Sequence, residues 1–141
     1  MEDAVDRARA IEDITRLLLS YPEAVDKGDF AGVGQLFDGV RLGDEDPMSA
    51  QQFEELWRKT VLTYEGGSPF TKHVVTNTLL EAGTDPGSVV STSYFQVLRS
   101  WGVANWGRYV DRMAQEGDRW RIAHRSVFVD GNIPRPEAPP A

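Results

Sequence analysis

Residues 71–81 read Thr-Lys-His-Val-Val-Thr-Asn-Thr-Leu-Leu-Glu, and at this stretch the chain changes from a helical to a strand-like pattern. Three further segments rich in Val, Thr, Tyr, Phe and Trp follow, at 88–100, 103–116 and 119–129. Turn-forming residues at 83–87 and 117–118 separate them. Because connections this short favour antiparallel pairing, and strands of about ten residues favour curvature, the second half predicts a strongly curved antiparallel sheet.

The residues before this stretch follow a helical period. Apolar side chains recur every three or four residues from Val5 to Val25, which predicts one long amphipathic helix. We expect Pro22 to bend this helix without ending it, because the apolar stripe continues beyond it. Gly28 is the expected stop, and Asp29 the expected cap of a short helix over 30–37.

A loop rich in Gly, Asp and Pro is expected over 38–47, and a third helix after it. Ser49 and Gln52 have the spacing of a capping box, and apolar positions continue from Phe53 to Tyr64. Gly66-Gly-Ser-Pro69 is expected to close the helical half. The pattern therefore predicts one α+β domain over 1–130, with about three N-terminal helices covering the concave face of the sheet, and a flexible proline-rich tail over 131–141.

Composition excludes several classes of function. The 141 residues include 15 Lys and Arg against 22 Asp and Glu, a net charge of −7, so nucleic acid is not an expected partner. Without Cys, thiolate chemistry and thiolate metal sites are excluded. No apolar run approaches a membrane span, and the acidic N-terminus is unlike a signal peptide, so a cytoplasmic protein is expected. Motifs for nucleotide cofactors, covalent serine chemistry and zinc proteases are missing, so no cofactor is expected.

Strand alternation suggests a polar site inside the sheet. It places His73 and Asn77 on one face of the first strand, together with Val75 and Leu79, and this face is expected to look into a cavity. Asp26, at the end of the first helix, could reach His73, fix its tautomer and leave the other ring nitrogen to move a proton. The alternative is a core histidine satisfied by a carbonyl group and a solvated helix-end carboxylate.

Further polar residues could line the same cavity. Tyr21, Tyr94 and Tyr109 could donate phenolic hydrogen bonds to a substrate carbonyl. Asp111 could serve as an acid–base group or form a salt bridge with an arginine of a neighbouring strand. His124 could line the pocket or merely pack beside Trp and Ile, and without ligand spacing no metal is expected.

The outward face of the 103–116 segment carries apolar side chains among basic ones. Trp106 and Val110 share this face with Arg108 and Arg112. An apolar outer face of a sheet often packs against another subunit, so a homodimer is expected.

The sequence resembles SnoaL-like proteins of the nuclear-transport-factor-2-like superfamily, which includes scytalone dehydratase, ketosteroid isomerase and dioxygenase β subunits. Four segments carry the resemblance, namely 21–30, 72–77, 107–111 and 117–122. The resemblance implies a cone-shaped, mixed or antiparallel sheet with three helices, a deep pocket, and a dimer or trimer.

The resemblance also implies roles for individual residues. Asp26 matches the aspartate that ends the first helix of scytalone dehydratase, and His73 matches a pocket histidine of that enzyme. The chain differs from scytalone dehydratase at two places. It has Val25 where the dehydratase has Tyr, and it has no histidine near Arg99, where the dehydratase has its second catalytic histidine.

We therefore expect a cofactor-independent dehydratase, isomerase or cyclase acting on a small apolar or aromatic carbonyl compound, a class that includes polyketide-type intermediates, in a pocket between helices and sheet. His73 and Asp26 are the expected catalytic pair; Tyr21, Asn77, Tyr94, Tyr109 and Asp111 are the expected substrate-binding residues. The alternative is a non-catalytic ligand-binding or subunit-assembly module of the same fold.

Overall fold

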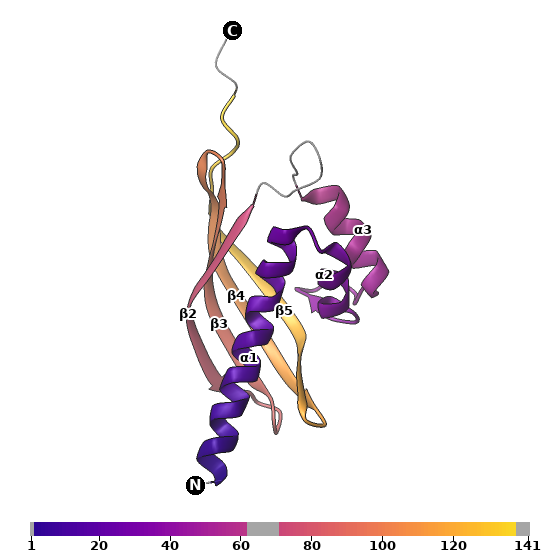
Figure 1. The fold of residues 1–141 in the computed structure, drawn as a ribbon, viewed down its shortest axis with the longest axis vertical. Helices are drawn as coiled ribbons and strands as arrows, with labels where there is room; N and C mark the ends of the chain where they lie inside the picture. The colour runs from indigo at the N-terminus through magenta and orange to yellow at the C-terminus, as the bar shows by residue number, and fades with distance from the viewer. Residues whose placement is uncertain (1, 62–70, 138–141) are drawn as a thin grey trace.

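Helix α1 (Glu2–Lys27) lies along the sheet as the longest helix of the computed structural model, which describes residues 2–61 and 71–137 (Figure 1). Ile14, Leu18, Tyr21 and Val25 form its buried stripe at the predicted spacing. Pro22 lies inside the helix without ending it, as predicted. The helix ends at Gly28, whose φ of 76° is the left-handed conformation that glycine adopts most easily.

Helices α2 (Phe30–Phe37) and α3 (Ala50–Thr60) form a pair beside α1. The Asp29 carboxylate accepts a hydrogen bond from the backbone N–H of Gly32, and Ser49 and Gln52 form the predicted capping box. The two helices come close at Gly34, where a Cβ atom would collide with the Ala50 carbonyl oxygen. Helix α3 ends at Thr60, earlier than predicted, and the expected continuation to Tyr64 and the closing turn lie outside the described residues.

The sheet has the order β1-β5-β4-β3-β2 and contains every predicted strand. Its long antiparallel strands are β2 (Lys72–Ala82), β3 (Val89–Arg99), β4 (Gly102–Glu116) and β5 (Arg119–Asn132). The two-residue strand β1 (Arg41–Leu42) pairs with β5 in parallel, inside the segment predicted as a loop. Two residues are too few to show alternation, so the sequence could not reveal β1.

Irregular pairing accompanies the strong curvature of the sheet (Figure 1). The register shifts between Thr76 and Leu79 in β2, and again at three places in the β3–β4 and β4–β5 pairs. Such bulges bend a strand and increase its twist. At Gly107 a Cβ would meet the Phe128 carbonyl oxygen and the Phe95 ring, so glycine permits close packing there. The predicted α+β fold, with N-terminal helices over a curved sheet, is confirmed; the sheet remains open.

Aromatic rings fill a band between the helices and the inner face of the sheet. Tyr21 meets Phe37 and Trp57 edge-on, with ring centroids 5.3 and 6.2 Å apart. On the sheet side, Phe95 and Tyr109 stack at 4.4 Å. This packing occupies space between helices and sheet where the resemblance implied a deep pocket.

The C-terminal segment leads away from the body of the fold (Figure 1). Strand β5 continues to Asn132, so the predicted tail boundary at residue 131 falls inside the strand and is too early. The backbone N–H of Ile133 donates to the Ala104 carbonyl oxygen, which ties the start of this segment to β4. Within the described residues, no helix has both the length and the apolar character needed to cross a membrane.

Candidate active site

Asp26 and His73 form a hydrogen-bonded pair between α1 and β2. The last turn of α1 holds Asp26, and His73 is the second residue of β2. The Asp26 Oδ1 atom lies 2.7 Å from His73 Nδ1, and Oδ2 accepts the backbone N–H of His73 at 2.8 Å. The Thr71 hydroxyl donates to Oδ1 at 3.3 Å. Three donors therefore fix the carboxylate, and the predicted meeting of Asp26 with His73 is confirmed as geometry.

This arrangement assigns different tasks to the two imidazole nitrogens. A carboxylate accepts hydrogen bonds, so Nδ1 carries the proton and Nε2 has the free lone pair. Within residues 2–61 and 71–137, nothing hydrogen-bonds to Nε2 of His73. The side chains of His73 and Asp26 are only 7% and 9% exposed, so water competes little for their hydrogen bond. The geometry therefore makes Nε2 the ring nitrogen that is available to exchange a proton with a ligand.

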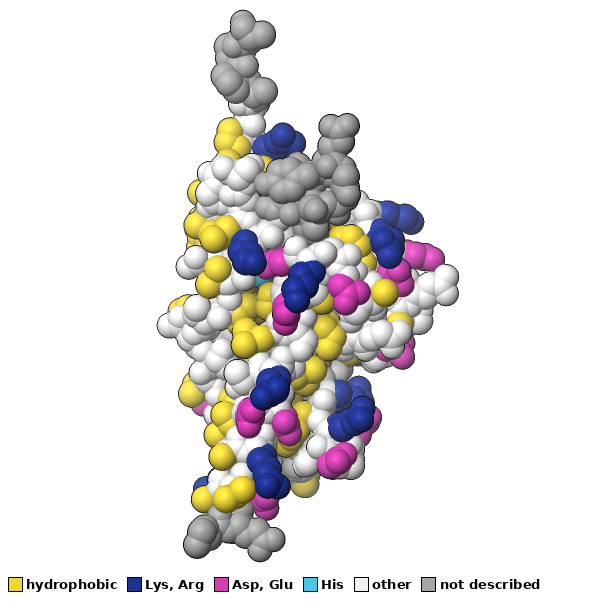
Figure 2. All heavy atoms as spheres, viewed as in Figure 1, with side chains coloured by type: hydrophobic (Ala, Val, Ile, Leu, Met, Phe, Trp, Pro, Cys, Tyr) yellow, Lys and Arg dark blue, Asp and Glu magenta, His cyan; other side chains and the backbone are white. Residues whose placement is uncertain are grey.

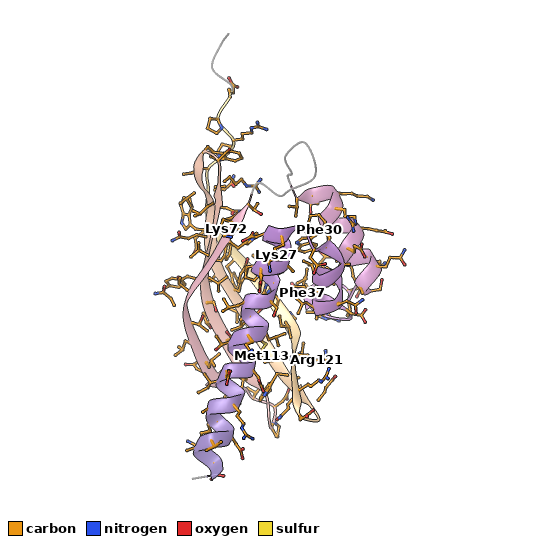
Figure 3. The ribbon with its side chains drawn as sticks, viewed as in Figure 1. Lys27, Phe30, Phe37, Lys72, Met113 and Arg121 are labelled. Atoms are coloured by element: carbon orange, nitrogen blue, oxygen red, sulfur yellow. The ribbon has the colours of Figure 1, made fainter. Side chains whose placement is uncertain are left out.

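A surface pocket of about 310 Å³ opens beside this pair, at the seam between α1 and β2. Its lining consists of Leu19, Pro22, Glu23, Asp26 and Lys27 from α1 and of Lys72 and His73 from β2. Figure 3 shows Lys27 near the end of α1 and Lys72 at the start of β2. The pocket thus combines an apolar wall, two ammonium groups and the imidazole.

Charges of both signs surround this side of the molecule. Figure 2 shows acidic and basic side chains intermixed along α1. Lys27 at the pocket donates to Glu23 at 2.6 Å. Lys72 forms no ion pair with any described residue, so its ammonium group can serve a ligand.

Tyr21 and Tyr109, two of the expected substrate-binding tyrosines, lie on the inner side of His73. The Tyr21 ring meets the His73 ring at 74°, with centroids 5.7 Å apart, and Tyr109 lies 6.3 Å beyond Tyr21. Burial raises the pKa of both Tyr21 and Tyr109, against the opposing influence of the Arg125 charge. Both phenols therefore remain protonated donors near neutral pH, but neither lines the pocket beside His73.

Asp111 forms a buried ion pair with Arg125. Its oxygens accept the Arg125 Nε–H and Nη2–H at 2.7 and 2.8 Å, and the Asp111 residue is completely buried. Burial disfavours the charged guanidinium, yet the hydrogen bonds and charge of Asp111 raise the pKa of Arg125 overall. The salt-bridge interpretation of Asp111 is correct, and the expected substrate contact is not: the carboxylate does not reach the pocket.

Arg125 also contacts the rings of two buried tyrosines. Its guanidinium lies 4.1 Å from the Tyr109 ring centroid and 5.1 Å from that of Tyr21. The sequence analysis allowed an arginine of a neighbouring strand as the partner of Asp111, but no local signal identified that arginine as Arg125 or predicted its contacts with the two tyrosine rings. The ion pair holds Tyr109 and Tyr21 in place behind His73.

Asn77 and Tyr94 lie on the outer face of the sheet, away from His73, so the expectation that they share its cavity is wrong. Asn77 lies in the register shift between Thr76 and Leu79 and has a φ of 55°. The shift ends the alternation on which the expectation rested. Tyr94 is 51% exposed and pairs with Arg108 across the β3–β4 ladder.

His124 is also removed from the candidate site. It pairs with Arg41 of β1, and its Nε2 atom lies 2.9 Å from the Gly43 carbonyl oxygen. A register shift between Arg112 and Met113 separates its face from that of Ile122, with which simple alternation grouped it. In the part of the chain that the structure describes, no three His, Asp or Glu side chains gather to hold a metal ion.

The curved, open sheet covered by three helices is the nuclear-transport-factor-2-like fold that the resemblance implied. The model of the SnoaL-like domain matches residues 6–126, and the chain belongs to this family. No curated protein matches the chain.

Solved structures show the same fold at low sequence identity. A type 2 hexachlorocyclohexane dehydrochlorinase, LinA, is 16% identical, with a TM-score of 0.72 over 97% of this chain and 98% of that one. A protein assigned as a scytalone dehydratase, from Novosphingobium aromaticivorans, is 12% identical, with a TM-score of 0.71 over 94% and 91%. The β subunit assigned to an aromatic-ring-hydroxylating dioxygenase of the same organism is 18% identical, with a TM-score of 0.65 over 89% and 92%.

Proposed function

We propose that the protein is a cofactor-independent acid–base enzyme of the lyase or isomerase type. The observation that carries this proposal is the Asp26–His73 hydrogen bond of 2.7 Å beside a pocket, with Nε2 of His73 unpartnered among the described residues. Dehydratase and dehydrochlorinase structures with this fold support it, since both names describe eliminations.

The proposed reaction begins with proton abstraction next to a carbonyl group. The C–H bond breaks, its proton moves to Nε2 of His73, and its electron pair moves toward the carbonyl oxygen as an enolate. Asp26 stabilises the resulting imidazolium by charge and hydrogen bonding. The enolate then expels a hydroxide, which takes the proton and leaves as water, or it is reprotonated at another carbon. The first course is dehydration, and the second is isomerisation.

The pocket suggests what the substrate is like. About 310 Å³ suits a small molecule, and Leu19 and Pro22 offer it an apolar wall. The Lys72 ammonium group can stabilise negative charge that develops on the carbonyl oxygen. We therefore propose a small apolar or aromatic carbonyl compound, with a polyketide-type intermediate as one member of that class.

A non-catalytic role is the second candidate, favoured by one specific contact. Oδ2 of Asp26 accepts the backbone N–H of His73, so the pair also ties the end of α1 to β2. A purely structural hydrogen bond between α1 and β2 needs no proton transfer. The dioxygenase β-subunit structure with the same fold is the structural neighbour that suits a module of this type.

Proton abstraction can be tested without knowing the physiological substrate. Acetophenone and phenylacetone, incubated with the protein in deuterium oxide, report abstraction as loss of their α-proton NMR signals. We expect exchange above the buffer rate, lost in His73→Ala and retained in His124→Ala, the matched histidine control. Exchange that is equal in His73→Ala and the unmodified protein would contradict the catalytic assignment, and no exchange with either ketone would favour the non-catalytic role.

A further inference from the structure

Three buried polar atoms without hydrogen-bond partners come from the end of the sheet where β3 turns into β4. They are Nη1 of Arg99, Nε1 of Trp101 and Oδ1 of Asn105. Among the described residues, only one other side-chain atom, Oγ of Ser91, is buried and unpartnered in this way. A buried polar group without a partner is costly, so the gathering of such atoms within residues 99–105 indicates that a polar ligand completes them.

The strand register places Arg99 and Asn105 on the same face of the sheet. Val97 is 5% exposed in the core, and Asn105 pairs with it across the β3–β4 ladder. The register shift next to this pair leaves Ala104 as the extra residue of β4, so Asn105 shares the inner face with Val97. Arg99 is two residues further along β3 and therefore lies on that face as well. Side chains diagonal to each other on two strands are about 7–8 Å apart, a separation that an arginine can span.

The positive charges at this end of the sheet have no counter-ion among the described residues. The guanidinium carbon of Arg99 lies 5.7 Å from the Trp101 ring centroid, and that of Arg135 lies 6.0 Å from it. Neither arginine forms an ion pair with a described residue. Burial lowers the pKa of Arg99, since it takes water away from the charge. Two cations beside one indole repel each other, and an anion bound between them removes that repulsion.

We propose that Arg99, Trp101 and Asn105 form a binding site for the carboxylate of a small hydroxy acid. The Nη1–H of Arg99 and the Nε1–H of Trp101 are two donors, which match the two oxygens of a carboxylate. Oδ1 of Asn105 accepts from the hydroxyl group of the same ligand. Arg135 adds a second positive charge. None of these residues lines the pocket beside His73, so the inference does not depend on the proposed reaction.

Proton–nitrogen NMR of the Trp101 indole N–H tests this proposal directly, and Trp101→Phe identifies the signal by its loss. The probes are lactate, propionate and propionamide, which share one carbon chain. At constant ionic strength, we expect lactate and propionate to shift the signal saturably, lactate at the lower concentration, and the uncharged propionamide to leave it unchanged. No response to either acid, or an equal response to propionate and propionamide, would overturn the anion site. A response to inorganic phosphate alone would overturn the choice of a carboxylate, and equal binding of lactate and propionate would overturn the hydroxyl contact.

Two substitutions test the assigned residues. Arg99→Gln should weaken lactate binding by roughly tenfold or more, because it removes a hydrogen bond from a charged donor. Asn105→Asp should abolish binding, because it places a carboxylate of the protein within reach of Arg99. Arg119→Gln is the matched control at the exposed start of β5, and it should bind lactate normally. Circular dichroism checks that each variant folds, and unchanged lactate affinity in folded Arg99→Gln or Asn105→Asp would overturn the assignment.

Discussion

Asp26 contacts His73 twice, through Oδ1 to the ring Nδ1 and through Oδ2 to the backbone N–H. One carboxylate thereby orients the imidazole and fixes the start of β2 against the end of α1. Asp26→Asn separates these two effects, because the amide oxygen can still accept the backbone N–H while the carboxylate charge is lost. We expect its ketone-exchange rate to fall roughly 10²–10⁴-fold.

Asp26→Ala is the companion variant for stability. It leaves the His73 N–H and the Thr71 hydroxyl without their acceptor, which should cost about 1–3 kcal/mol in the free energy of unfolding. Urea denaturation measures this difference, and Asp26→Asn should lose clearly less than Asp26→Ala. Equal stability of the two variants would show that the backbone contact contributes little.

Lys72→Gln should lower the exchange rate about five- to tenfold, because one partly screened charge contributes about 1 kcal/mol to stabilising an enolate oxygen. Lys59→Gln, on the exposed side of α3, is the matched control and should exchange at the unmodified rate. The rates are measured with the same ketones. A Lys72→Gln protein as fast as the control would remove Lys72 from the proposed mechanism.

The buried Asp111–Arg125 pair predicts a large stability effect when one partner is removed. Asp111→Asn should lower the free energy of unfolding by about 3–5 kcal/mol, since it leaves the Arg125 charge buried without its counter-ion. The surface pair Glu12–Arg16 provides the control, and Glu12→Gln should cost less than about 1 kcal/mol. If urea denaturation shows a similar loss in the free energy of unfolding for Asp111→Asn and Glu12→Gln, the buried, paired state of Arg125 is contradicted.

Alkaline pH should destabilise the fold through Tyr21 and Tyr109. Burial raises the pKa of both phenols above the ordinary value of 10.0, so above that pH the unfolded chain loses protons that the folded chain keeps. Stability should therefore be constant with respect to these groups below pH 10.0 and decline above it. Above pH 10.0 the free energy of unfolding should fall by up to about 2.7 kcal/mol per pH unit when both tyrosines contribute. Tyr109→Phe should reduce this slope in urea titrations, whereas an unchanged slope would contradict the role given to Tyr109.

The sequence predicted the helices and the four long strands because each depends on local signals. Each of these signals spans only a few neighbouring residues: the helical spacing, the caps at Asp29 and Ser49, and the change from a helical to a strand-like pattern at Thr71. The Asp26–His73 pair joins residues 47 apart, and its prediction rested on the predicted end of the first helix, the predicted face of the first strand and the family resemblance. The faces of Asn77 and His124 could not be predicted in the same way. One extra residue in a bulge reverses the alternation, and the sequence carries no clear signal of the bulges next to them.

The most direct test of the account is proton–nitrogen correlation NMR of the His73 ring near neutral pH. We predict that Nδ1 of His73 carries the proton donated to Asp26, and that the Nε2 shift changes when phenylacetone is added. His124 provides the internal reference, and its shifts should not respond to the ketone. A proton on Nε2 of His73, or an Nε2 signal unaffected by either ketone at saturating concentration, would contradict the assignment of His73 as the group that moves the proton.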